Sequence, residues 1–157
     1  MTSENSLICA RFRLEMKAVR RPADAFLLLR VSCVAALVPV AMRLPLPKTT
    51  ALIRPRSPRA ARRGAPPEYA GRVVAAVEAA RIAGYPVIRQ GCLTRAVTLY
   101  WFLARAGMPV ELRFGIARDA SPDIAADGHA WLALDGAPFL EKVDPEPKFT
   151  VTYRIPA

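Results

Sequence analysis

One cysteine and one histidine carry most of the chemistry that this sequence offers. Cys92 follows Gly91 where a loop is expected to become a helix, and His129 is the single histidine of the chain. A cysteine in the first helical turn lies near unpaired backbone N–H groups and the positive end of the helix dipole, which favour the nucleophilic thiolate. An imidazole beside the sulfur can act as base and then as acid. The pair predicts nucleophilic catalysis.

Such a pair needs a third group that holds the imidazole in the right tautomer. Asp144 is the preferred candidate, because strands of a hairpin bring their residues side by side. Glu141 is an alternative, and Asp135 is a weaker one because Asp-Gly is better explained as a hairpin turn. A lone histidine is more often structural. The position of His129 at the start of a strand, after a helix that carries a cysteine, favours the catalytic interpretation.

Helices are predicted before this pair of residues and strands around it. Apolar residues recur at helical spacing from Cys92 to the breaker Gly107. Residues 67–84 have the same pattern, and residues 25–42 form an almost wholly apolar helix. The proline-rich stretch 44–67 is expected to be a connector without regular helix. Residues 1–21 are predicted to form a peripheral basic helix.

Strand patterns fill the last third of the chain. Alternating apolar residues and turn signals predict four strands, with a loop at 118–127. Helices followed by an antiparallel meander indicate an α+β fold. We expect residues 1–67 to form a basic helical region with a linker, and residues 68–157 to form the catalytic domain. The predicted strands are residues 111–117, 128–134, 137–143 and 148–155.

Charge suggests an acidic partner. The 157 residues have a formal net charge of +10 and a pI of about 10.4. The basic residues gather between positions 11 and 63, whereas positions 119–146 are acidic. An acidic peptide and an anionic membrane both fit this distribution. No nucleic-acid partner is expected, since no aromatic residue accompanies the arginines of 44–67 as a stacking platform.

Cysteine usage predicts a cytoplasmic protein. Cys9, Cys33 and Cys92 match neither a disulfide framework nor a zinc pattern, so no metal or other cofactor is expected. The polar start of the chain is a poor signal peptide. The apolar helix at 25–42 is at the lower limit of length for crossing a bilayer and contains Arg30. We expect it to be buried, with membrane-surface contact as the alternative.

The motifs resemble those of the transglutaminase-like superfamily, whose fold is similar to that of papain-like cysteine peptidases. The matching runs are Cys-Leu-Thr-Arg-Ala at 92–96, the strand at 109–115, Gly-His-Ala-Trp at 128–131 and Asp-Gly at 135–136. More narrowly, they resemble the microcin-type B proteins of lasso-peptide biosynthesis. The resemblance covers roughly residues 69–144.

This resemblance implies a leader peptidase. Such proteins remove the leader from a ribosomally made precursor peptide, after which a separate ATP-dependent cyclase closes a macrolactam ring. By matching positions, Cys92 is the nucleophile, His129 the base and Asp144 the acid. Glu141 lies nearer the spacing of the narrower family, which usually has Asp there. Because no leader-binding module precedes position 25, a separate leader-recognition protein is expected.

Two other functions remain as alternatives. A transglutaminase of the same fold would transfer acyl groups from glutamine side chains to amines. A non-catalytic scaffold would bind a leader peptide or a membrane through the basic first half of the chain. Arg95 is expected to be a structural hydrogen-bond donor in each case.

Overall fold

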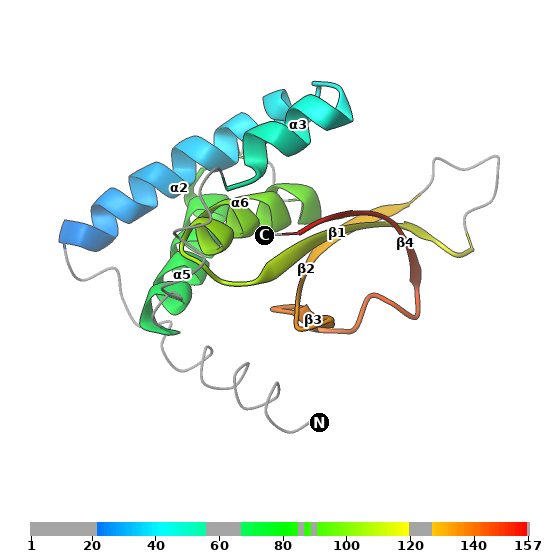
Figure 1. Ribbon diagram of the computed structural model, residues 1–157. Helices are drawn as coiled ribbons and strands as arrows, with labels where there is room; N and C mark the ends of the chain where they lie inside the picture. Colours follow the sequence, from blue (N-terminus) through cyan, green and yellow to red (C-terminus); the bar gives the residue numbers. More distant parts are fainter. Residues whose placement is uncertain (1–21, 56–66, 85–86, 89–90, 120–126, 157) are drawn as a thin grey trace.

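The computed structural model describes residues 22–55, 67–84, 87–88, 91–119 and 127–156 (Figure 1). In these residues helices precede strands, which confirms the predicted α+β class. The helix predicted within residues 1–21 lies outside the described residues. The helices are α2 (Pro22–Ala41), α3 (Leu46–Ile53), α5 (Pro67–Ala83) and α6 (Cys92–Arg105), and the strands are β1 (Val110–Ala117), β2 (Gly128–Leu134), β3 (Ala137–Phe139) and β4 (Phe149–Ile155).

The strands form one antiparallel sheet in the order β3-β2-β1-β4. Asp135 and Gly136 form the predicted hairpin turn, with φ values of 51° and 82°. The third strand was predicted to run to residue 143, and this is wrong: it ends at Phe139. The physical reason is Leu140, whose φ of 63° turns the chain out of extended conformation.

Helix α6 is the centre of the fold and packs against α2, α5 and the sheet (Figure 1). Its apolar face is formed by fully buried side chains such as Leu99, Tyr100 and Leu103. The helix ends at Arg105, Gly107 then takes a φ of 89°, and the N–H of Met108 donates to the Leu103 carbonyl at 3.0 Å. This left-handed end suits glycine, as the sequence predicts.

The predicted apolar helix is α2. Its inner face, which includes Val31 and Ala35, is buried against α5 and α6. By length and composition alone the segment Asp24–Ala41 is also apolar enough to cross a membrane, with a mean hydropathy of 1.9. Core helices of soluble proteins can be equally long and apolar, so length and composition alone do not place this helix in a membrane.

Helix α3 corrects the prediction of a helix-free connector at 44–67. Pro45 is the residue before the helix and Pro47 lies in its first turn, where a missing N–H breaks no helical hydrogen bond. The Thr49 hydroxyl donates to the Ala41 carbonyl at 3.0 Å, and Ile53 is buried. The prediction for residues 46–53, which rested on the density of prolines, is therefore wrong. Both prolines lie at the start of the helix, where proline is tolerated.

Candidate active site

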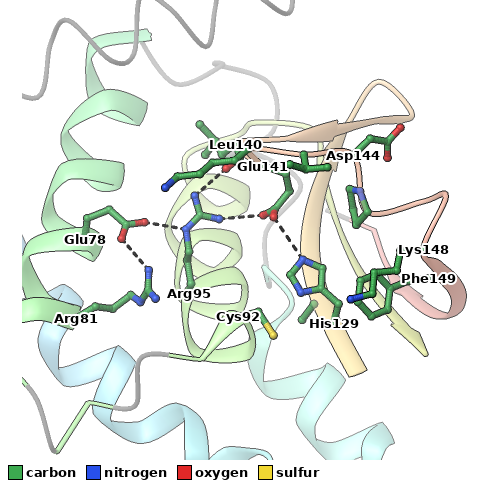
Figure 2. A pocket seen from close by; sticks show the side chains of 14 residues that line it. Glu78, Arg81, Cys92, Arg95, His129, Leu140, Glu141, Asp144, Lys148 and Phe149 are labelled. Atoms are coloured by element: carbon green, nitrogen blue, oxygen red, sulfur yellow. Dashed lines mark hydrogen bonds and ion pairs between the residues drawn. The ribbon is translucent and has the colours of Figure 1, made fainter. Parts of the chain in front are cut away.

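Cys92 is the first residue of α6, as predicted. Gly91 precedes it with φ −69° and ψ 159°, and among the described residues no side chain caps the helix start. The Cys92 sulfur is partly exposed and lies 3.9 Å from the Gly128 carbonyl oxygen, at the start of β2. Cys92 and His129 line the same cavity, and Figure 2 shows the sulfur on the side of α6 nearer to the imidazole. The fold therefore brings the predicted nucleophile and the predicted base together.

His129 stands on β2, opposite Gly115 of β1. Its ring stacks on Phe149 and on Trp131, with centroid distances of 5.1 Å and 5.7 Å. Its Nε2 lies 3.4 Å from a carboxylate oxygen of Glu141. Because Nε2 faces this carboxylate, Nδ1 is the ring nitrogen that can exchange a proton with the sulfur of Cys92.

The carboxylate beside His129 belongs to Glu141 and not to the preferred candidate, Asp144. Asp144 lines the same cavity, but its Oδ1 accepts the N–H of Glu146 at 2.9 Å and its side chain points away from the imidazole (Figure 2). The turn at Leu140 explains the difference, since it directs the next residue back toward His129. Asp135 lies in the hairpin turn.

Arg95, one turn along α6 from Cys92, holds Glu141 in place. Its guanidinium donates to Glu141 Oε1 at 3.0 Å and to the Leu140 carbonyl at 2.8 Å. A third contact, at 2.7 Å, joins Arg95 to Glu78 of α5. These three donors fix both the backbone turn and the carboxylate that follows it. Sequence alone indicated a structural role for Arg95 but not its acceptors, which come from two distant segments, α5 and the loop after β3.

Glu78 extends this ion-pair network to α5, because its second oxygen pairs with Arg81 at 2.7 Å. The resulting series of charged groups runs from α5 through α6 to the loop after β3 (Figure 2). Side chains of the series are between 15% and 32% exposed. Partial burial of this kind strengthens charge-assisted hydrogen bonds relative to those at an open surface.

Trp131 forms the base of the site. The side chain is fully buried, and its ring lies against Gly115 of β1. A Cβ at position 115 would come within 2.9 Å of that ring, so only glycine leaves room for it. Gly115 therefore leaves room for the ring of Trp131, on which the ring of His129 stacks.

A cavity of about 560 Å³ opens over these residues. Its lining carries both signs of charge, with basic and acidic side chains from several elements: Arg81, Arg95, Lys142 and Lys148, and Glu78, Glu141 and Asp144. Within the described ranges, no group of three or more His, Cys, Asp or Glu side chains is placed to hold a metal ion. The cavity is large enough for a few residues of an extended peptide.

The helix-borne cysteine, the strand-borne histidine and the antiparallel sheet define the class of protein. The sequence profile of the transglutaminase-like superfamily matches residues 34–154, and the chain belongs to this superfamily. The match begins within α2 and ends in β4. The superfamily includes cysteine peptidases. Searches of curated proteins and of solved structures gave no match.

Proposed function

We propose that this protein is a cysteine peptidase that removes the leader from a ribosomally made, lasso-type precursor peptide. One observation carries the proposal: Cys92 begins α6 beside His129, whose far ring nitrogen faces Glu141. This is the order nucleophile, base and orienting carboxylate that thiol proteolysis requires. Glu141 takes the third role in the proposal, in place of Asp144.

The first half of the reaction forms an acyl-enzyme. His129 takes the proton of Cys92, and the thiolate adds to the scissile carbonyl of the peptide. The Cys92 backbone N–H, which has no partner among the described residues at the start of α6, is a donor for the developing oxyanion. As the tetrahedral intermediate collapses, the C–N bond breaks and His129 gives its proton to the leaving amine. The core peptide departs with a free N-terminus, and the leader stays on sulfur as a thioester.

The second half releases the leader. His129 removes a proton from water, the hydroxide adds to the thioester carbonyl, and the C–S bond breaks to give the leader carboxylate and the cysteine. Glu141 accepts the Nε2–H of His129 throughout and stabilises the imidazolium that forms twice in each cycle. Its second oxygen remains on Arg95, so the carboxylate does not rotate as the charge on the ring changes.

The substrate class rests on the resemblance of the motifs at 92–96 and 128–131 to lasso-peptide B proteins. In this proposal the partners are the precursor peptide, a separate protein that recognises its leader, and the ATP-dependent cyclase that uses the freed amine. The protein acts in the cytoplasm, where precursor peptides are made.

The test is cleavage of a synthetic lasso-type precursor, with and without the leader-recognition protein of the same biosynthetic system, followed by mass spectrometry. We expect leader and core fragments from the wild type and none from Cys92→Ala or His129→Ala. Cys33→Ala is the matched control, because Cys33 is exposed on α2 and touches none of these residues. Cleavage retained in Cys92→Ala would contradict the proposal.

The second candidate is a non-catalytic scaffold that binds a leader peptide or a membrane. The exposed apolar side chains of α2 favour it, because an enzyme core does not need them. A scaffold would bind the precursor equally well in the wild type and in Cys92→Ala and would release no fragment from either.

A further inference from the structure

The outer face of α2 has a continuous apolar ridge, formed by Phe26, Leu29, Cys33, Leu37 and Val40. Steps of three and four residues place these side chains on one side of the helix. The four large ones are 58–62% exposed, and Cys33 at the centre of the ridge is also exposed. Soluble surfaces rarely leave such a strip uncovered, so the ridge is an interaction surface.

The charge around the ridge has one sign. Residues 25–67 contain no Asp or Glu but eight Lys and Arg residues. Arg43, Lys48 and Arg54 are exposed on or beside the short α3 that follows the ridge. The nearest acid, Asp24, is already paired with Arg72 at 2.6 Å. An apolar strip with a basic border is complementary to an anionic lipid surface.

We propose that α2 lies flat on an anionic membrane surface, with the ridge inserted among the acyl chains and the basic border against the headgroups. The inner face of the helix decides between lying flat and crossing. Val31 and Ala35 are 0% and 1% exposed because they pack against α5 and α6. Crossing the bilayer would pull these residues out of the core, whereas lying flat leaves the core intact.

Arg30 fits the same arrangement. Its guanidinium lies 5.8 Å from the ring centre of Phe26 and 5.7 Å from that of Phe102 in α6. The charge therefore sits at the side of the ridge, where it can reach headgroups while its stem covers apolar surface. At the centre of a bilayer the same charge would be costly.

A second copy of the chain fits this face less well. Pairing two ridges would bring two basic borders together without an acidic residue between 25 and 67 to compensate. Membrane contact also leaves the active site open, since none of the residues that line the cavity belongs to α2.

Cys33 gives a direct test, because it lies in the middle of the ridge. The full chain with Cys9→Ser and Cys92→Ser is labelled at Cys33 with a polarity-sensitive fluorophore and mixed with phosphatidylcholine vesicles, with or without phosphatidylglycerol. We expect a blue shift, with partitioning at least about tenfold stronger into anionic vesicles and reversed by high salt. Quenchers placed near the lipid headgroups should act more strongly than quenchers at the ends of the acyl chains.

Two variants complete the test. Leu29→Glu with Leu37→Glu should abolish the shift, while Ile116→Glu, an equally apolar exposed position on β1, should not. All three positions are exposed, so circular dichroism should show folded protein for both variants. The proposal would be overturned if the protein bound neutral and anionic vesicles equally, or bound neither. It would also be overturned if quenchers at the bilayer centre acted more strongly, or if the ridge caused self-association in place of lipid binding.

Discussion

Glu141 contacts both His129 and Arg95 through one carboxylate. Its Oε2 lies 3.4 Å from Nε2 of His129, and its Oε1 lies 3.0 Å from the guanidinium of Arg95. The contact with His129 is long for a hydrogen bond, as is common before substrate is bound. Because the two oxygens have different partners, the carboxylate is oriented before the reaction begins.

The first prediction separates Glu141 from Asp144. Glu141→Gln removes the charge that stabilises the imidazolium, and we expect kcat for precursor cleavage to fall by about 10²-fold or more. Asp144→Asn changes a side chain that accepts the backbone N–H of Glu146 and points away from the imidazole, so kcat should change less than about twofold. The measurement is steady-state cleavage of one precursor by both variants. The reverse order of effects would assign the third role to Asp144.

The second prediction concerns Arg95, which acts through Glu141. Arg95→Ala should lower kcat by about 10- to 100-fold, as loss of a supporting hydrogen bond commonly does. Arg95→Lys should restore only part of this, because one ammonium group cannot reach acceptors on Glu78, Leu140 and Glu141 together.

A double-mutant cycle distinguishes this role from general loss of structure. Combined with Glu141→Ala, Arg95→Ala should add almost no further loss in kcat, since the carboxylate that it positions is gone. Arg72→Ala serves as the control, because Arg72 pairs with Asp24 and neither residue lines the cavity. Additive losses in the cycle would contradict a role through Glu141.

The third prediction concerns stability at high pH. Burial raises the pKa of Tyr100 to about 12 from its ordinary 10.0, although Arg54 and Arg105 act in the opposite direction. The folded protein therefore keeps this proton at pH values where the unfolded chain loses it. Its contribution to stability is complete below about pH 10 and disappears between pH 10 and 12, up to about 2 kcal/mol.

Tyr100→Phe isolates this effect. The variant should be about 1 kcal/mol less stable at neutral pH, because the hydroxyl donates to the Pro156 carbonyl at 2.7 Å. Above pH 10 it should lose less stability than the wild type. Urea unfolding of both proteins from pH 8 to 11.5 measures the difference, and parallel curves would contradict the prediction.

The fourth prediction compares two valines of α2. Val31 is 0% exposed and Val40 is 58% exposed. Val31→Ala should lower the free energy of unfolding by about 2 kcal/mol, because it leaves a cavity between α2 and its neighbours. Val40→Ala should change it by less than about 0.5 kcal/mol. Equal losses in urea unfolding would mean that the ridge is covered in the free protein.

The sequence was enough to predict the elements that carry Cys92 and His129. Helix α6 has one apolar face, a glycine before it and a glycine after it, so local rules and tertiary packing agree. The same is true of β2 and β3, whose register is fixed by the Asp135-Gly136 turn between them. Local patterns were therefore sufficient wherever no distant residue opposed them.

The contacts among distant segments could not be predicted in this way. Leu140 takes a left-handed backbone that its residue type disfavours, and the Arg95 guanidinium on its carbonyl is the visible compensation. Because the sequence does not reveal that contact, the third strand was expected to continue past Phe139. A strand of that length would have placed Asp144 near His129. The carboxylate that lies beside His129 is thus placed by a turn whose supporting hydrogen bond joins residues 45 positions apart.

The most direct test of the central claim is the alkylation of Cys92 by iodoacetamide across pH, in a chain with Cys9→Ser and Cys33→Ser. If His129 keeps the sulfur ionised, the rate should persist well below the pKa of about 8.5 of an ordinary thiol, and His129→Ala should remove this low-pH reactivity. A rate that follows an ordinary thiol and does not change in His129→Ala would contradict the account of a cysteine peptidase.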